Sequence, residues 1–341
     1  MQTNDSLAIL TADDIISLLN GREREIMGVI EAAYRAHARG STNCPHSLFL
    51  RLPQRGNSRI IALPAYIGEE MDVAGLKWIS SFPSNTDLGL PRASALIVLN
   101  SMETGRAYAV MEGSIISAKR TAASAALAAQ RLIADPDSVS CVGIVGCGEI
   151  NREVLGFLSK RLTSLTHVRV FDTSSERARV FQSFCEERLS LESQPAKSIT
   201  EVLSGGQLIS VATTAVEPHI QTVSPCPPST VILHLSLRDL APEVLYAVDN
   251  VVDDIDHVCR ANTSLDLAAK ASGHRRFIRT TIGNILNGDA PPIAGDGRTA
   301  VFSPFGLGIL DVSLAEHVYR LAERGGKSLV LPGFHATASR P

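Results

Sequence analysis

The first forty residues carry apolar positions at the spacing of amphipathic helices. Thr11 is followed by Asp13 and Asp14, a sequence typical of a helix start with acidic residues in its first turn. Apolar residues then recur at positions 15, 18, 19, 26, 29, 30 and 33, and Asn20-Gly21 interrupts the series. We therefore expect one or two helices within residues 11–39.

The pattern changes after residue 47, where short runs rich in β-formers are separated by Pro, Gly or Asn. These runs are SLFLRL, RIIALPAYI, GLKWISSF and ASALIVLN, and they end near residue 110. They predict a mostly antiparallel sheet. Residues 115–133 are rich in alanine and predict a helix, which Asp135-Pro136 ends.

From residue 139 onward, strand and helix patterns alternate. A buried strand (139–146) precedes a helix (149–162), and a second strand (167–172) precedes a second helix (174–189). Further strands are expected within 208–213, 230–236 and 250–254, and a last helix over 307–326, before a polar tail at 333–341. Such alternation predicts a parallel sheet with helices on both faces, the Rossmann-type α/β class.

Composition narrows the class of protein. A chain of 341 residues that is 45% hydrophobic and 20% charged suits an enzyme of about two domains. The net charge of −3 and the absence of a polybasic run give no reason to expect nucleic acid or an anionic membrane as a partner. The six cysteines form no C-x-x-C pair and no zinc spacing, so we expect reduced thiols, no metal and a cytoplasmic protein.

The most specific local motif is VGIVGCGEINREVLGF, which joins the first strand of the alternating region to its helix. Gly146 permits a tight turn, and Gly148 lets the backbone approach a pyrophosphate at the helix N-terminus. Cys147, Glu149 and Ile150 complete this candidate cofactor loop. Asn151 stands where the G-x-G-x-x-G pattern has its third glycine, a position that serves close helix–strand packing.

Asp172 ends the second strand, where a carboxylate can accept the ribose hydroxyls of NAD and repel the extra phosphate of NADP. Thr173 and Ser174 supply no arginine for that phosphate, so the sequence favours NAD. Three further residues follow later strands and are candidates for the same cofactor site: Thr213, Thr214 and Ser236. The alternative is a ligand-free turn in which Asp172 caps the next helix.

Four segments, in order along nearly the whole chain, resemble the ornithine cyclodeaminase/mu-crystallin family: GLKWISSFPSN, SAKRTAASAALAA, VGIVGCGEIN and FGLGILDVSLA. RIIALPAYIG, LPRASALIVLN and VVDD are most similar to the branch of N-(2-amino-2-carboxyethyl)-L-glutamate dehydrogenases. The resemblance implies a homodimer. It also implies a discontinuous α+β substrate-binding and dimerisation domain over 1–125 and 314–341, with an NAD-binding Rossmann domain over 126–313.

The resemblance also implies residue roles. Lys77 and Arg120 match the cations that hold the substrate α-carboxylate, and Arg51 matches a third carboxylate-binding cation. Asp239 matches the catalytic acid/base, although the sequence after it, Leu-Ala-Pro-Glu, departs from the D-x-P-G-K of the family. Lys77 is expected at the reacting centre as well. Asp311 follows a family pattern that we interpret as structural.

Two features separate the branches. Cyclodeaminases are expected to carry a glutamate shortly before the proline that matches Pro64, and residues 60–63 contain no acid. Arg92 adds a further cation to Arg51, Lys77 and Arg120, more than one carboxylate needs, so a substrate with three carboxylates is favoured.

The predicted reaction is NAD-dependent oxidative hydrolysis of N-(2-amino-2-carboxyethyl)-L-glutamate to 2,3-diaminopropionate and 2-oxoglutarate, for siderophore or peptide antibiotic biosynthesis. Alternatives are an ornithine or lysine cyclodeaminase, a reductase of imino or keto acids, and a non-catalytic ligand binder resembling mu-crystallin. Ordinary structural roles remain open for single residues: a solvated strand position for Lys77, a polar helix face for Arg120, a turn cap for Asp239, a surface charge for Arg92 and a core position for His234.

Overall fold

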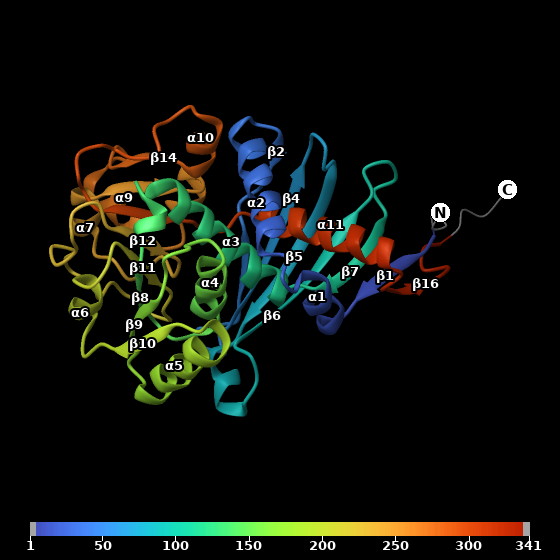
Figure 1. Cartoon of the computed structure of the whole chain (residues 1–341). Helices are drawn as coiled ribbons and strands as arrows, with labels where there is room; N and C mark the ends of the chain where they lie inside the picture. Colours follow the sequence, from blue (N-terminus) through green and yellow to red (C-terminus); the bar gives the residue numbers. More distant parts are fainter. Residues whose placement is uncertain (1–4, 337–341) are drawn as a thin grey trace. The chain divides into compact units, whose positions relative to one another are not determined.

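The computed structural model describes residues 5–336, and the chain divides into two compact units (Figure 1). Unit 1 comprises the described residues up to Arg120 together with those from Leu307, and unit 2 is Thr121–Gly306. The domain borders expected from the sequence, after residues 125 and 313, fall inside α3 (Ser114–Leu132) and α11 (Gly308–Gly325). The end of the predicted polar tail, 337–341, lies outside the described residues.

The helices of unit 1 follow the predicted periodicity. α1 (Ala12–Leu19) begins with a capping box in which Thr11 and Asp14 each bond the other's backbone, and α2 (Glu23–Ala38) follows after the break at Asn20-Gly21. Both helices pack against α11, which returns from the far end of the chain.

The sheet of unit 1 has the strand order β16-β1-β7-β6-β5-β4-β2, with β3 paired to β4. It is antiparallel as predicted, except where β1 runs parallel to β7. Its strands are β1 (Leu7–Leu10), β2 (Thr42–Asn43), β3 (Leu48–Arg51), β4 (Arg59–Ile67), β5 (Val73–Ser81), β6 (Ala93–Asn100), β7 (Ala107–Glu112) and β16 (Leu329–Leu331), with a 3₁₀ helix over Pro83–Leu88.

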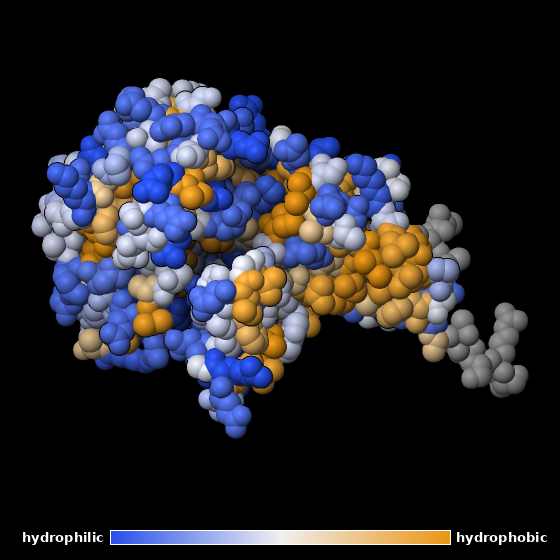
Figure 2. Space-filling model, turned by 90° about the horizontal axis from the view of Figure 1, so that it is seen from below, coloured by the Kyte–Doolittle hydropathy of each residue, from blue (hydrophilic) through white to orange (hydrophobic). Residues whose placement is uncertain are grey.

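The two faces of this sheet differ in what covers them. α11 packs across β4, β5 and β6, and a Cβ added at Gly75 would lie 3.0 Å from a methyl group of Val312. On the opposite face, Trp78 and Leu96 are directly paired across β5 and β6 and are 39% and 52% exposed. Figure 2 shows an extended apolar area on the part of the molecule that carries the grey terminal residues, which is unit 1.

Unit 2 is a wholly parallel sheet with the strand order β10-β9-β8-β11-β12-β15-β13-β14. The order reverses between β8 and β11, the switch point at which Rossmann-type sheets bind dinucleotides. The strands are β8 (Cys141–Val145), β9 (His167–Phe171), β10 (Glu192–Pro195), β11 (Leu208–Val211), β12 (Val231–His234), β13 (Asp249–Val252), β14 (Ile278–Thr281) and β15 (Ala300–Ser303).

The helices of unit 2 cover this sheet, and the predicted Rossmann-type α/β class is confirmed. After α3 and a short 3₁₀ helix (Pro136–Ser138) come α4 (Glu149–Ser159), α5 (Ser175–Leu189), α6 (Ile199–Leu203), α7 (Pro242–Ala247), α8 (Ile255–Val258), α9 (Ser264–Ser272) and α10 (Ile282–Asn287). Among the described residues, no helix is both long and apolar enough to cross a membrane.

Candidate active site

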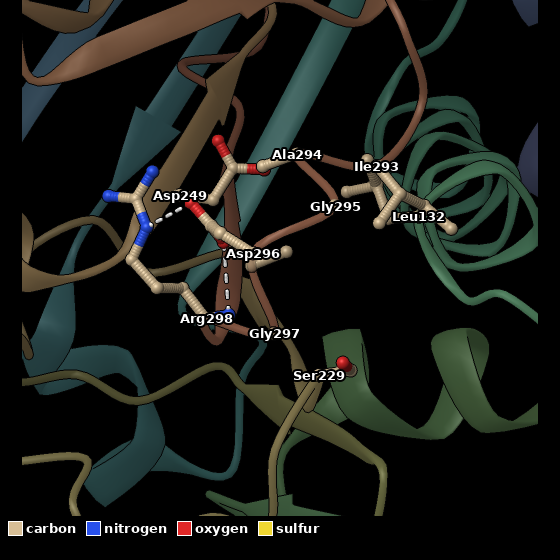
Figure 3. Close-up of a pocket in the computed structure, with 10 residues that line it drawn as sticks. Leu132, Ser229, Asp249, Ile293, Ala294, Gly295, Asp296, Gly297 and Arg298 are labelled. Atoms are coloured by element: carbon tan, nitrogen blue, oxygen red, sulfur yellow. Dashed lines mark hydrogen bonds and ion pairs between the residues drawn. The ribbon is translucent and has the colours of Figure 1, made fainter.

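A small pocket lies at the edge of the unit 2 sheet where the strands begin (Figure 3). Ser229 precedes β12, Asp249 is the first residue of β13, and Ala300 is the first residue of β15. Ligands of open parallel sheets bind at the opposite edge, where the strands end. The pocket therefore lies away from the sheet edge at which the sequence predicts the cofactor site.

The glycine turn after β8 has the geometry that a dinucleotide requires. Gly146 has a φ of +91°, and a Cβ there would lie 2.3 Å from the carbonyl oxygen of Ala212. Gly148 is the N-cap of α4; no side chain caps the helix there, and a Cβ on Gly148 would meet nothing within 4 Å. The first N–H groups of α4, from Glu149 and Ile150, thus face open space that an anionic pyrophosphate can fill.

Asn151 accounts for the missing third glycine. Its side chain is fully buried, and its Nδ2 donates to the carbonyl oxygens of Val145 (3.1 Å) and Gly146 (2.6 Å). Its Oδ1 accepts a hydrogen bond from the Ser210 hydroxyl at 2.6 Å. Asn151 therefore ties α4 to the end of β8 and to β11 by hydrogen bonds, where a glycine would serve only close approach.

Asp172 follows β9 beside the turn. Its carboxylate accepts the backbone N–H of Cys147 at 2.9 Å and that of Ser174 at 2.8 Å, and Arg177 lies at 3.1 Å. Burial raises the pKa of Asp172, but the hydrogen bonds from Ser174, Cys147 and Arg177 outweigh it and hold the pKa below its usual value. The sequence reading missed Arg177, which sits in the first turn of the helix that Ser174 caps.

The thiol of Cys147 is not a nucleophile in this turn. Burial, and next the negative charge of Asp172, raise its pKa to about 12. Cys147 contributes to the site through its backbone N–H. All six cysteines are free, and residues 5–336 contain no group of three or more His, Cys, Asp or Glu residues able to hold a metal ion.

Asp239 is fully buried in the loop between β12 and α7, and four side chains lie within hydrogen-bonding distance of its carboxylate. Thr213 and His219 reach Oδ1, the His219 Nε2 at 3.1 Å, while Ser236 and the Nε2 of His234 reach Oδ2, the latter at 3.2 Å. The other ring nitrogen of His234 lies 3.0 Å from the Ser303 hydroxyl. Thr213 also donates its backbone N–H to Ser236, and Thr214 follows in the same loop after β11.

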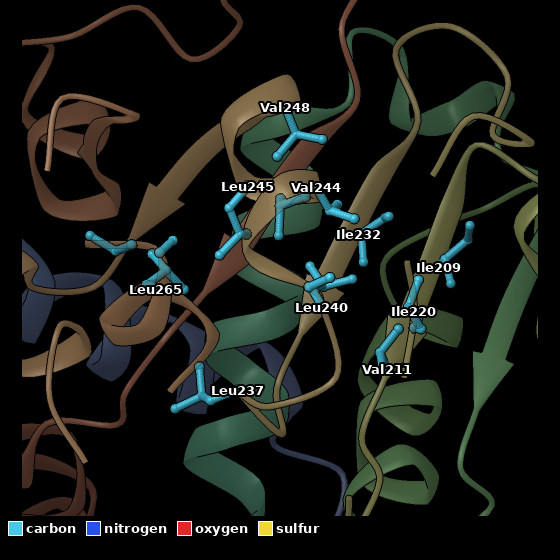
Figure 4. Close-up of a cluster of buried hydrophobic side chains, with 14 of the residues drawn as sticks. Ile209, Val211, Ile220, Ile232, Leu237, Leu240, Val244, Leu245, Val248 and Leu265 are labelled. Carbon is cyan, nitrogen blue, oxygen red and sulfur yellow. The ribbon is translucent and has the colours of Figure 1, made fainter. Parts of the chain in front are cut away.

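Hydrophobic anchors hold this loop in place. Leu237 and Leu240, on either side of Asp239, belong to the buried cluster drawn in Figure 4. Leu237 has a φ of +67°, a conformation that costs a leucine free energy and persists only because its surroundings fix it. Although burial raises the pKa of Asp239, hydrogen bonds from His234, Ser236 and Thr213 bring it well below its usual value, so the carboxyl is ionised.

Unit 1 contains a second buried charge cluster, which joins two of the predicted cations. The Lys77 ammonium lies 2.7 Å from Oδ2 of Asp311, and the Arg120 Nε donates to Oδ1 at 3.1 Å. Lys77 also donates to the Ser117 hydroxyl at 3.1 Å. Burial lowers the pKa of Lys77 to about 8, the charge of Asp311 opposes this shift, and the charge of Arg120 adds to it.

The other two predicted cations lie elsewhere on the same sheet. Arg51 of β3 is paired with Arg59 of β4, and Arg59 is paired with Ser81 of β5. Ser81 lies four residues along β5 from Lys77, so these two positions are about 13 Å apart. Arg92 precedes β6; its Nε is buried and hydrogen-bonds to none of the described residues. The structure thus brings Lys77 and Arg120 together and leaves Arg51 and Arg92 outside their cluster.

A comparison with known families now bears on these sites. The profile of the ornithine cyclodeaminase/mu-crystallin family matches residues 6–326, almost the whole chain. The chain belongs to this family. The resemblance predicted from the sequence is thereby confirmed.

Two relatives in the family are similar over nearly their full length. An alanine dehydrogenase of Archaeoglobus fulgidus is 30% identical over 322 residues, which cover 92% of this chain and 94% of the relative. An N-((2S)-2-amino-2-carboxyethyl)-L-glutamate dehydrogenase of Staphylococcus aureus is 29% identical over 328 residues, 94% of this chain and 97% of the relative. The two identities differ too little to choose between the two reactions.

Solved structures of family members share the fold. A Δ1-pyrroline-2-carboxylate reductase of Thermococcus litoralis, in complex with NADH and L-proline, has a TM-score of 0.88 and 25% identity, covering 95% of this chain and 99% of that one. An archaeal alanine dehydrogenase dimer with bound NAD has a TM-score of 0.85 and 28% identity, covering 96% and 99%.

Proposed function

We propose that this protein is an NAD-dependent dehydrogenase that oxidises the secondary amine N-(2-amino-2-carboxyethyl)-L-glutamate and releases 2,3-diaminopropionate and 2-oxoglutarate. The observation that carries an amino acid as substrate is the cluster of Lys77, Arg120 and Asp311, and the choice of this amine rests on Arg92. Two buried cations share one carboxylate, so the cluster has one positive charge in excess, which the α-carboxylate of an amino acid substrate would neutralise.

The cofactor is NAD. The turn at Gly146–Gly148 and the N-terminus of α4 suit its pyrophosphate, and Asp172 suits the ribose hydroxyls. Thr213 and Thr214, after β11, suit the remainder of the dinucleotide. When bound, NAD accepts the hydride from the α-carbon of the glutamate moiety.

We assign the choice of substrate to Arg92 and Arg51, the two cations outside the cluster of Lys77 and Arg120. A half-buried guanidinium without a carboxylate partner, as at Arg92, is an expensive arrangement unless an anion completes it, and burial lowers the pKa of Arg92. Arg51 offers a further positive charge on the same sheet. A substrate with three carboxylates uses all four cations, whereas alanine uses only Lys77 and Arg120.

Side chains of the protein bind the substrate carboxylates and transfer protons in this reaction. Lys77 and Arg120 hold the α-carboxylate and so orient the C–H bond that is broken. The ionised Asp239 supplies the negative charge of the hydrogen-bond network of unit 2, through which protons are transferred. The product 2,3-diaminopropionate would serve siderophore or peptide antibiotic biosynthesis, in the cytoplasm, where free thiols such as the six found here persist.

We further propose that the protein is a homodimer joined through the exposed sheet face of unit 1. Trp78 and Leu96 place two large apolar side chains next to each other on that face, and exposed apolar patches of this kind are typical of interfaces. The archaeal alanine dehydrogenase, similar over almost its whole length, is a dimer.

The proposal is tested by comparing kcat/KM among candidate substrates, with NADH absorbance as the readout. The secondary amine should exceed L-alanine, L-ornithine and L-proline by at least about a hundredfold. Arg92→Gln should narrow that ratio by lowering kcat/KM for the amine alone. A preference for alanine that Arg92→Gln leaves unchanged would instead make the protein an alanine dehydrogenase.

A further inference from the structure

We propose that His219 is the residue that exchanges protons with the reacting groups, and that Asp239 acts on it as a positioning residue. This inference rests on the proposed function for the identity of the substrate. It is based on the difference in burial between the Asp239 side chain, which is fully buried, and the His219 side chain, which is partly exposed.

Asp239 has no capacity left for a substrate. Each of its two carboxylate oxygens lies within hydrogen-bonding distance of two side chains, Thr213 and His219 at one oxygen and Ser236 and His234 at the other. The backbone N–H of Asp239 also donates to Nε2 of His234 at 3.3 Å. These neighbours surround the roughly four acceptor positions of a carboxylate. Because the side chain is also fully buried, a proton can reach Asp239 only through one of its four partners.

His219 is the partner of Asp239 that reaches the surface. Its side chain is 33% exposed, and its Nε2 lies 3.1 Å from Oδ1 of Asp239. The ionised carboxylate assigns the proton to Nε2, which leaves the lone pair of Nδ1 free to accept another. Within the described part of the chain, no hydrogen bond occupies Nδ1.

The backbone fixes this pair as rigidly as the side chains do. The N–H groups of His219 and Ile220 both donate to the Asp239 carbonyl oxygen, at 2.9 and 2.8 Å, and Ile220 forms an isolated parallel bridge with Leu240. The imidazole is therefore held at one distance from the carboxylate, after β11 and β12, at the sheet edge where a dinucleotide binds. An orienting carboxylate behind an accessible imidazole is the arrangement used for general base catalysis.

His234 contacts the same carboxylate but cannot play this role. It is fully buried, and both ring nitrogens are engaged, one with Asp239 and the other with Ser303. Among the described residues, His219 contacts the carboxylate of Asp239, which also contacts His234, and Glu217 lies two residues away on the same loop. His219 thus faces one negative charge and one partner histidine.

Water addition and amine release each move one proton through His219. The secondary amine reacts in its neutral form, after its ammonium proton has passed to solvent, and loss of hydride from the α-carbon leaves an iminium ion. Water adds to its carbon, the C–O bond forms, and one water proton moves to Nδ1 of His219, which leaves a neutral carbinolamine. His219 then gives this proton to the amine nitrogen, the C–N bond breaks, and the hydroxyl loses its proton to solvent as the carbonyl of 2-oxoglutarate forms.

His219→Gln tests the proposal, because a glutamine amide can still donate to Asp239 but cannot titrate. We expect kcat with the secondary amine to fall about a hundredfold or more, while the dissociation constant for NADH changes less than twofold. The acidic limb of the wild-type kcat/KM–pH profile should disappear. The double variant with Asp239→Asn should be no slower than the slower single variant, since the two residues act as a unit. His167→Gln, at an exposed histidine of β9, is the matched control and should leave kcat and the pH profile unchanged.

Retention of kcat within threefold by His219→Gln, with an unchanged pH profile, would overturn the proposal. If alanine or another amino acid proves to be the substrate, the proposed function fails, and the same variants test His219 with that substrate. Imidazole ¹⁵N NMR of histidine-labelled protein needs no substrate: we expect the Nε2–H tautomer for His219 at neutral pH, lost in Asp239→Asn. The Nδ1–H tautomer would contradict the proposal.

Discussion

At the scale of single residues, the chain buries charge in two places and compensates it in different ways. Asp239 is surrounded by donors that keep it ionised, whereas Lys77 and Arg120 share Asp311 and keep a positive charge in excess. An incompletely neutralised cluster costs free energy of folding, and binding of a carboxylate would recover it. Two predictions concern single residues, one for Lys77 and one for the two glycines of the turn after β8.

Lys77 should make the binding of carboxylate ligands depend on pH. Its pKa of about 8 means that the ammonium is charged below pH 8 and loses its proton above it, well before an ordinary lysine does. The inhibition constant of 2-oxoglutarate, which has no group that titrates between pH 7 and 10, should therefore be flat below pH 8 and rise toward tenfold per unit above it. Lys270→Met, at an exposed lysine of α9, should keep this profile. An inhibition constant that stays flat to pH 10 would show that Lys77 does not bind the carboxylate.

The two glycines of the turn should respond differently to alanine. Gly146→Ala puts a methyl group into the Ala212 carbonyl at a positive φ, so we expect the free energy of unfolding to fall by more than about 1 kcal/mol. Gly148→Ala meets open space and should cost at most about 1 kcal/mol through poorer capping. Its methyl group nevertheless occupies the approach to the pyrophosphate and should weaken NADH binding about tenfold. Fluorescence titration and urea unfolding measure the two effects, and tight NADH binding by Gly148→Ala would place the dinucleotide elsewhere.

At the scale of elements, the long periodic segments are those that the sequence predicted. Helices within 11–39, the Ala-rich helix and the alternation after residue 139 all appear, because amphipathic spacing and buried apolar runs are local signals. Most of the missed strands are short or polar: β2 and β16 have two and three residues, β1, β14 and β15 have four each, and β10 reads Glu-Ser-Gln-Pro. These strands form by pairing with strands that lie far away in the sequence, and no local sequence pattern indicates such pairing.

The same limit applies to the candidate site. The glycine turn and Asp172 could be predicted because a strand, a turn and a helix adjoin one another in sequence. His219 could not, since only the parallel bridge between Ile220 and Leu240 brings it to Asp239. Nothing in the spacing of Lys77, Arg120 and Asp311 shows that they meet. The family resemblance predicted roles for Lys77 and Arg120, but only the folded structure shows which residues these side chains contact.

Asn151 should stabilise the turn after β8 more than a glycine at the same position would. Asn151→Gly removes three hydrogen bonds, although the Val145 carbonyl oxygen keeps the N–H of Ala212, so we expect a loss of about 1–3 kcal/mol in the free energy of urea unfolding. Ser210→Ala removes only one of the three bonds and should cost less. A glycine variant as stable as the parent chain would show that close packing alone suffices at this position.

At the scale of the whole molecule, the proposed assembly depends on the exposed sheet face of unit 1. Leu96→Asp places a charge beside Trp78 and should convert the dimer into monomers, since a buried unpaired carboxylate is costly. Light scattering after size exclusion measures the mass, and the fluorescence of Trp78, the single tryptophan of the chain, should shift to the red as it becomes solvated. Val180→Asp, at a valine of α5 in unit 2 that is 50% exposed, is the matched control and should remain dimeric. A dimeric Leu96→Asp variant would exclude this face as the interface.

The central claim is that one secondary amine is oxidised and hydrolysed for each NAD reduced. The most direct measurement counts products in one reaction mixture of protein, NAD and N-(2-amino-2-carboxyethyl)-L-glutamate. NADH is read at 340 nm, and 2-oxoglutarate and 2,3-diaminopropionate by mass spectrometry. We predict the three in equal amounts, with no ammonia. Ammonia released from ornithine or lysine without net NADH, or NADH formed with pyruvate from alanine while the amine stays intact, would contradict the claim.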